Sequence, residues 1–294
     1  MYIKGPASYG SSARLQKHSG LSKKKVDRFL QGNDAYTKYR PVRYTFPRLK
    51  VLAFRINEIW SLDLADLSKI QSYNGGTRYL LVAVDVLSRY LRVERLKDKT
   101  AKTTAAAFAK MLKKKKPEKV WVDKGTEFKG EFKKLCDKKN IHIYSTHSEK
   151  KSAFAERNIR SLKNIMYKHL EKYWTYSYIS KLPEFVNTIN TRVNRVTGLA
   201  PNKVFKKHTA HLVSLTNTRK ASRPTFKVGD FVRIAKEDLP FKKGYKQSYT
   251  DELFEIVNIP TLNPPSYQLK DITGEEIKGK FYQQELSKVN GPTR

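Results

Sequence analysis

The chain has 294 residues, with 60 lysines and arginines against 27 aspartates and glutamates, which leaves a formal net charge of +33. Its hydrophobic share of 39% is enough to build folded cores and excludes a disordered basic tail. The charge predicts a polyanionic partner, above all nucleic acid, bound with a steep salt dependence. A ribosomal-type protein and a membrane-surface protein are the alternatives before motifs are considered.

The N-terminal segment, residues 1–47, is polar and basic and is predicted to form a small helical module. Two short helices are expected at 12–17 and 22–30, with Ser22 as the N-cap of the second and a turn at 18–21 between them. This pattern is typical of a helix-turn-helix unit. Its second helix carries cations that could meet DNA phosphates, although a solvated basic helix that only packs is equally open: Lys23, Lys24, Lys25 and Arg28.

Residues 48–206 are predicted to form an α/β core, which begins with three antiparallel strands. The runs 59–64 and 79–86 flank Asn74-Gly75-Gly76, which we interpret as a hairpin turn, and a strand at 90–93 follows a second turn. The second run is nearly all apolar, as in a strand that is buried on both faces. The first part of the core is therefore expected to be a three-stranded antiparallel sheet.

Alternating helices and strands follow these three strands and complete a mixed sheet of five strands with helices on its faces. Long helices are expected after the last strand, and Pro183 is expected to kink or split the second of them. In chain order, helices are predicted at 104–115 and 128–139, strands at 119–122 and 141–144, and the long helices at 153–172 and 175–192.

The C-terminal third is predicted to be a linker followed by a small β domain. Residues 207–224 are polar and have no clear periodicity, as in a linker. Residues 225–294 contain four short strand-like runs between Gly, Pro and Asn turns, at 226–235, 253–259, 266–271 and 276–282.

Cysteine usage and hydropathy narrow the expected compartment. The single cysteine, Cys136, rules out an intramolecular disulfide and a multi-cysteine zinc site, which suits the reducing nucleus or cytoplasm. No apolar run approaches the roughly 18 residues of a membrane span, and the N-terminus lacks the apolar core of a signal peptide. We expect a soluble protein that has no membrane partner.

Three acidic residues stand at element ends that the predicted sheet can bring together. Asp63 ends the first strand, Asp123 directly follows the fourth strand, and Glu156 lies near the start of the first long helix. Converging carboxylates are costly unless they bind metal, and hard oxygen ligands favour Mg²⁺ or Mn²⁺. Two such ions, about 4 Å apart, would activate a water or a 3′-hydroxyl and stabilise the leaving oxygen. The competing acids are Asp66, Asp85, Glu127 and Glu149.

The motifs around these acids resemble the catalytic core of retroviral integrases and related transposon integrases. Trp60-Ser61-Leu62-Asp63 resembles the first motif, 120–128 the second, 155–163 the third, and 197–201 the segment that closes the core. The resemblance covers residues 48–206 and implies an RNase H-like fold with a D,D,E triad. The segments 34–43 and 226–230 look most like integrases of the Maverick or Polinton group.

This resemblance implies a DNA integrase that processes the 3′ ends of a mobile element and joins them to target DNA, using two divalent ions. Its expected partners are both DNAs, further copies of the chain as a homo-multimer, and chromatin, in the host nucleus.

The chain departs from the family pattern in two places. The interval between Asp123 and Glu156 is slightly short for the family, which predicts a shortened loop at 145–152, and one cysteine cannot build the retroviral zinc module.

The same resemblance suggests DNA contacts in the core and in the tail. Arg160 and Lys163 share the helix face of Glu156, and Asn158 and Lys124 could touch phosphate. The tail resembles the SH3-like domains of integrases and also chromodomains. Its cations suited to DNA are Arg233, Lys242, Lys243 and Lys246, and its aromatics Phe231, Phe241, Tyr245 and Tyr249 are expected in the core rather than in a methyl-lysine cage.

Two other functions remain open on the sequence alone. One is a domesticated DNA- or chromatin-binding protein that keeps the fold without catalysis, against which the intact triad argues. The other is a plain RNase H-like nuclease, which needs the same metals but neither the basic tail nor the closing segment at 197–201.

Overall fold

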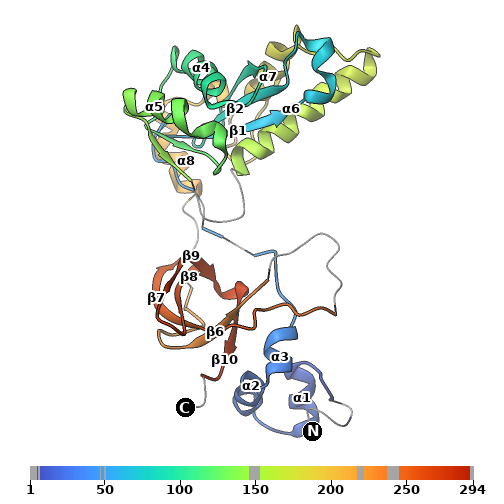
Figure 1. The fold of residues 1–294 in the computed structure, drawn as a ribbon, viewed down its shortest axis with the longest axis vertical. Coiled ribbons are helices and arrows are strands. Elements are labelled where there is room, and N and C mark those ends of the chain that lie inside the picture. Colours follow the sequence, from blue (N-terminus) through green and yellow to red (C-terminus); the bar gives the residue numbers. More distant parts are fainter. Residues whose placement is uncertain are drawn as a thin grey trace. The chain divides into compact units, whose positions relative to one another are not determined.

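A computed structural model of the chain describes residues 5, 7–46, 48–49, 51–145, 153–216, 222–236 and 245–291. The chain divides into two compact units (Figure 1). One unit consists of Lys50–Thr218, and the other combines the two ends of the chain, Met1–Leu49 and Arg219–Arg294. Among the described residues, no helix is both long and apolar enough to span a bilayer.

The unit formed by Lys50–Thr218 is built on a mixed sheet of five strands, as predicted from the sequence. The strands are ordered β3-β2-β1-β4-β5. The first three pair antiparallel, and β4 and β5 run parallel to β1. Their bounds are β1 Ile59–Asp66, β2 Tyr79–Asp85, β3 Leu91–Leu96, β4 Lys119–Trp121 and β5 His142–Tyr144.

Helices cover both faces of this sheet. On one face, α4 and α5 pack against Trp60 and Leu62 of β1. On the other face, α6 and α7 pack against Ala65 of β1 and against β2. Alternate residues of a strand point to opposite faces, so even positions of β1 face α4 and odd positions face α6. The helices are α4 Ala101–Leu112, α5 Gly130–Lys138, α6 Ala153–Lys172, α7 Leu182–Thr191 and α8 Thr209–Thr216, with 3₁₀ turns η1 Ser68–Asn74, η2 Thr126–Phe128, η3 Pro201–Lys203 and η4 Lys206–His208.

Helix ends and faces in this unit follow local chemistry. Thr100 caps α4 by accepting a hydrogen bond from the Thr103 backbone N–H. In α6, Leu162, Met166 and Leu170 recur every four residues and form the buried side of an amphipathic helix. Pro183 stands in the first turn of α7, where its missing N–H costs nothing, so the helix begins there and is not kinked.

Residues 209–216 form α8, although this part of the chain was predicted to be a structureless linker. Leu212 is buried with Ala53 and Val204, and this tertiary contact supplies the stability that the local sequence lacks. Asn74-Gly75-Gly76 ends η1 and is not a simple two-residue hairpin turn, although both glycines adopt the left-handed backbone expected there.

The second unit contains a five-stranded antiparallel sheet, ordered β10-β6-β7-β8-β9, and three short helices (Figure 1). Hydrogen bonds join its parts: the backbone N–H groups of Ser248 and Tyr249 both donate to the carbonyl of Lys38 at 2.9 and 3.1 Å. Two elements, α3 and β10, were not predicted from the sequence. The bounds are α1 Ser12–Ser19, α2 Lys23–Gln31, α3 Asp34–Tyr39, β6 Phe231–Ile234, β7 Phe254–Leu262, β8 Pro265–Asp271, β9 Glu276–Tyr282, η5 Gln283–Glu285 and β10 Leu286–Val289.

Candidate active site

Asp63 lies on β1, on the face of the sheet that α6 covers. Ser61 is two residues earlier on the strand, and its Oγ accepts a hydrogen bond from the backbone N–H of Ala155 in α6 at 3.3 Å. Residues two apart share a face of a strand, so the side chain of Asp63 projects on this α6 side. Asp63 is half-buried, and its Oδ1 accepts a hydrogen bond from the Leu64 N–H at 2.8 Å.

Asp123 lies two residues beyond the end of β4, the strand that runs parallel to β1. Ser61 pairs with Trp121, so Asp63 and Asp123 each lie two residues beyond the same rung of the sheet. The Trp121 ring contacts the ring of Phe154 in α6 edge-on, with centroids 6.0 Å apart, which puts odd positions of this segment on the α6 face too. Adjacent strands are about 4.8 Å apart, so Asp123 follows a strand that lies directly beside the one that carries Asp63.

Glu156 lies in the first turn of α6, one residue after Ala155. The hydrogen bond between Ala155 and Ser61 therefore holds the beginning of this helix against β1. Ala155 is completely buried, whereas Glu156 is exposed. A carboxylate in a first turn also interacts favourably with the helix dipole, so its position alone does not demonstrate a catalytic role.

Asp63 and the segment that leads to Asp123 thus lie on the α6 face of the sheet, and Glu156 lies at the start of that helix. That the three carboxylates converge stays a prediction. They do not form a finished metal cluster: within the described part of the chain, no group of three or more His, Cys, Asp or Glu side chains is arranged to hold an ion. The oxygen-only donor set of Asp63 and Asp123 fits Mg²⁺ or Mn²⁺. The fit of the third ligand, Glu156, requires an approach that this structure does not contain.

Comparison with known proteins identifies the core. A family model described as "Integrase core domain" matches residues 55–151. A transposon-derived protein of Caenorhabditis elegans, itself uncharacterized, is 33% identical over 216 residues, which are 72% of this chain and 74% of the relative. The chain belongs to the same family as this transposon-derived protein, and it carries an integrase core domain.

Solved structures share the integrase fold. A chain of the simian T-cell lymphotropic virus intasome, solved by cryo-electron microscopy with a PP2A regulatory subunit, aligns with a TM-score of 0.68 at 15% identity, covering 96% of this chain and all of that one (100%). The HTLV-2 integrase catalytic core domain, solved with magnesium, gives a TM-score of 0.42 at 23% identity, covering 50% of this chain and 95% of that one. The alignment with the intasome chain, together with the family match, shows that the mixed five-stranded sheet of this chain has the integrase core fold.

Two of the competing acids are committed to structure elsewhere in the integrase core. Asp85 is only 1% exposed, pairs with Trp60 at the amino end of β1, and accepts hydrogen bonds from Ser88 N–H and Oγ–H at 2.7 and 2.8 Å. Asp66 has even parity on β1, which directs it away from the face of Asp63. A hydrogen bond from the Ser68 N–H lowers the pKa of Asp66, as expected for a turn cap.

Of the other two acids that compete for the triad, Glu127 and Glu149, the structure describes only Glu127. Glu127 is half-buried in η2, and its carboxylate folds back over Gly125, where an added Cβ would lie 2.5 Å from Oε2. Glu149 falls outside the described residues, as does 146–152 of the loop that we predicted to be shortened.

The predicted DNA contacts of the core differ in availability. Arg160 is exposed on α6, and so is Lys124 beyond β4. Lys163 is half-buried and donates through Nζ to the carbonyl of Asp66 at 3.0 Å, so its reach to DNA is shortened. Asn158 donates one hydrogen of Nδ2 to the carbonyl of Phe154 at 2.9 Å, so only the second Nδ2 hydrogen is a donor that a phosphate could accept.

In the second unit, which we call the terminal unit, some of the residues predicted to contact DNA are exposed and one is buried. The cations of α2 are exposed opposite its buried Val26 and Leu30: Lys23, Lys24, Lys25 and Arg28. Lys246 is exposed, and Lys242 and Lys243 lie outside the described residues. The interpretation of Arg233 as a DNA contact needs correction, because it is 3% exposed, its Nη2 lies 2.9 Å from a carboxylate oxygen of Asp34, and its Nη1 donates to the carbonyls of Thr250 and Asp251.

The aromatic residues of the β domain do not behave as one group. Tyr249 is buried, as predicted, and burial raises the pKa of its hydroxyl. Tyr245 is 72% exposed and therefore does not belong to the core, contrary to our prediction. Phe231 is half-buried, and Phe241 is outside the described residues.

Ser61 is the residue whose role sequence reasoning missed. It was recognised only as part of the first motif, yet its Oγ accepts the Ala155 N–H that positions the start of α6. A serine amid the apolar residues of a buried strand was the available signal, because a buried hydroxyl requires a partner.

Proposed function

We propose that this chain is the integrase of a mobile element, a metal-dependent polynucleotidyl transferase that processes 3′ DNA ends and joins them to target DNA. The observation that supports it best is that Asp63 and Asp123 each follow the paired residues Ser61 and Trp121 by two positions, on the side of the sheet that is covered by α6, the helix whose first turn carries Glu156. The integrase core domain and the transposon-derived relative agree with this function.

In the proposed mechanism, Asp63, Asp123 and Glu156 hold two divalent ions. Bound Mg²⁺ or Mn²⁺ would lower the pKa of an attacking oxygen and stabilise the leaving oxygen of an in-line displacement. Ser61 keeps Glu156 at the edge of the site by binding the helix one residue before it. Arg160, exposed one turn further along α6, is suited to hold a phosphate of the element end.

The wider proposal concerns partners and setting. DNA of the element ends and of the target would be bound by the basic surface, and a homo-multimer would be needed to hold two ends at once. We place its work in the host nucleus, with chromatin as a further partner of the SH3-like tail, and in the Maverick or Polinton group on the segments 34–43 and 226–230. As functional parts we propose residues 1–47, 48–206 and 225–294, joined by 207–224, a segment that includes α8 and is therefore not a structureless linker.

The test is a strand-transfer assay with labelled duplexes whose ends are taken from the DNA that flanks the gene, at inverted repeats if the flanks carry them. Wild-type protein with Mn²⁺ should give joined products, and Asp123→Asn should abolish them while duplex binding is retained. Asp66→Asn is the matched control, because it makes the same change on β1 but on the other face. Normal joining by Asp123→Asn would remove that residue from the site.

The same assay separates the rival functions. Hydrolysis without joining by the wild-type protein would indicate an RNase H-like nuclease, and duplex binding without either reaction would indicate a domesticated, catalytically silent protein. A thermal melt supplies a readout that does not need activity. Mn²⁺ should raise the melting temperature of the wild type and of Asp66→Asn, but not that of Asp63→Asn/Asp123→Asn.

A further inference from the structure

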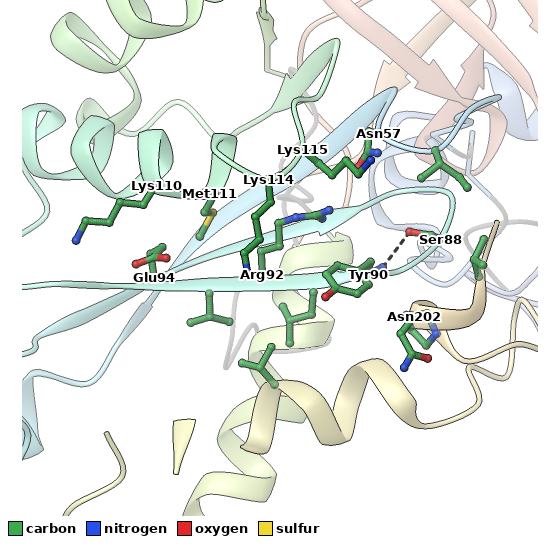
Figure 2. Close-up of a pocket in the computed structure, with 16 residues that line it drawn as sticks. Asn57, Ser88, Tyr90, Arg92, Glu94, Lys110, Met111, Lys114, Lys115 and Asn202 are labelled. Carbon is green, nitrogen blue, oxygen red and sulfur yellow. Dashed lines mark hydrogen bonds between the residues drawn. The ribbon is translucent and has the colours of Figure 1, made fainter. Parts of the chain in front are cut away.

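A cavity of about 510 Å³ lies along β3, the edge strand of the core sheet (Figure 2). This volume falls within the range of small-molecule sites. Its wall includes Arg92 of β3, which pairs with Ala83 on the α4 face, the face opposite to Asp63. The cavity also reaches the other side of β3, where Val186 of α7 lines it, but none of its lining residues is Asp63, Asp123 or Glu156.

Four cations and one acid line this cavity, which makes it strongly positive. Glu94 is its only acidic lining residue among those the structure describes. None of the ion pairs found in the described residues involves any of these five charged groups. The cations, labelled in Figure 2, are Arg92, Lys110, Lys114 and Lys115.

The guanidinium of Arg92 is held in place by two aromatic rings. Its Cζ lies 4.1 Å from the ring centroid of Trp60 and 4.7 Å from that of Tyr90. Its Nη1 is buried and has no hydrogen-bond partner among the described residues. Burial lowers the pKa of Arg92, and the nearby carboxylate of Asp85 offsets this effect only in part.

Asn57 adds an oriented amide to the same wall. Its Oδ1 accepts a hydrogen bond from the Trp60 Nε1–H at 3.1 Å, which turns Nδ2 into the free end of the side chain. The backbone of Asn57 is left-handed, with φ 61°, and its N–H donates to the buried Asp85 carboxylate. Asparagine adopts this conformation at low cost, so the turn holds the amide in place without marked strain.

A purely structural explanation accounts for only part of this arrangement. Lysines near the end of α4 interact favourably with the helix dipole, and the Arg92 stem covers Trp60. Neither explains why a clamped guanidinium, two adjacent lysines and an oriented amide face one cavity without a carboxylate that pairs with them. Planar guanidinium, ammonium and amide donors are the groups that recognise phosphate oxygens.

We propose that this cavity binds closely spaced phosphate groups, either of a free polyphosphate or of a nucleic acid backbone, at a site apart from the carboxylates. Arg92 and Asn57 provide fixed donors, and Lys114 and Lys115 provide charge at the rim. The site does not depend on the proposed catalysis, so its test uses binding alone.

The experiment titrates the full chain with inorganic tripolyphosphate by calorimetry at about 0.15 M salt, where nonspecific surface attraction is screened. One saturable site per chain is expected. Lys114→Gln/Lys115→Gln should raise the dissociation constant about tenfold or more, because about one charge-assisted hydrogen bond to the ligand is lost. The matched control is Lys133→Gln/Lys134→Gln, an exposed pair on α5 outside the cavity, which should change it less than about twofold.

A second variant and a second probe distinguish the sources of phosphate. Arg92→Lys keeps the charge but loses the planar fork, and should weaken tripolyphosphate binding while thermal melting reports that the chain is folded. A labelled DNA duplex tests the backbone. If the DNA backbone fills the cavity, Lys114→Gln/Lys115→Gln should lower the number of neutralised phosphates, which is measured from the salt dependence of duplex binding, by about one to two more than the control pair does. If both pairs change duplex binding equally, the ligand is a free polyphosphate.

Three results would overturn the proposal. One is no saturable binding of tripolyphosphate by the wild type, and another is equal weakening by the two lysine pairs, which would indicate a generic basic surface. The third is a wild type that ignores tripolyphosphate while Lys114→Gln/Lys115→Gln changes the mass measured by sedimentation, because the cavity would then be an interface between copies.

Discussion

Arg233 provides the sharpest test of the terminal unit, because its charge is buried and its partners are known. Its Nη1 donates to the carbonyls of Thr250 and Asp251, and its Nη2 pairs with Asp34, which is 69% exposed. The buried guanidinium therefore ties α3 to the β domain. Arg233→Met keeps much of the side-chain volume and removes all three contacts.

The magnitude follows from the environment of each contact. A hydrogen bond to a charged group contributes about 1.5–3 kcal/mol, but the carbonyls of Thr250 and Asp251 can be rehydrated at the surface, so the lower end applies. The ion pair with exposed Asp34 contributes about 0–1 kcal/mol. Arg233→Met should thus lower the free energy of unfolding by about 2–4 kcal/mol, and Asp34→Asn by about 1 kcal/mol or less.

Urea unfolding of the full chain, followed by a probe of the terminal unit, measures both variants, and anisotropy with a labelled duplex measures DNA binding under native conditions. We expect the loss of stability without a specific loss of DNA affinity once the fraction folded is taken into account. The reasoning is refuted if Arg233→Met leaves stability unchanged and weakens the duplex complex, since Arg233 would then act as a DNA contact after all.

Four further predictions test other parts of the molecule. Trp174 is 89% exposed and has a left-handed backbone, with φ 47°, in the turn that ends α6. Glycine adopts this conformation without steric cost, so Trp174→Gly should raise the free energy of unfolding by about 0.5–1 kcal/mol in urea titrations. A decrease would mean that the indole ring packs against the protein. Ser61→Ala should lower the free energy of unfolding by about 1–2 kcal/mol, because the Ala155 N–H loses its acceptor, and should impair strand joining more than duplex binding. Burial raises the pKa of Cys136 to about 12, so iodoacetamide should label the native thiol about a thousandfold more slowly than the urea-unfolded thiol, and equal rates would contradict its burial. The pKa of Asp66 is lowered in the folded state, so the ionised carboxylate stabilises the fold above the ordinary carboxyl range, and this stabilisation is lost as pH falls through the lowered pKa. In acid titrations, Asp66→Asn should therefore lose less unfolding free energy than the wild type between about pH 5 and about pH 2. An equal loss in both proteins would show that Asp66 does not stabilise the fold in this way.

Much of the core was predictable because its signals are local. The apolar run of β2 requires burial on both faces, the glycines after Asn74 require a turn, and the alternation of helix and strand after β3 predicts parallel pairing. The candidate acids were identified for the same reason. Asp63 lies inside β1 and not at its end, contrary to our prediction, whereas Asp123 lies two residues beyond β4. The alternation of side chains along a strand decides which face an acid can reach.

What the sequence by itself determined is which residues are able to form a strand, a turn or a cation-rich helix, since these depend on neighbours a few positions away. Only the tertiary structure decided that Arg233 is buried against Asp34, that α8 forms at residues 209–216, and that Arg92 lies between Trp60 and Tyr90. Charge and helix propensity are properties of single residues, whereas burial and partners depend on segments that are distant in the chain and meet only after folding.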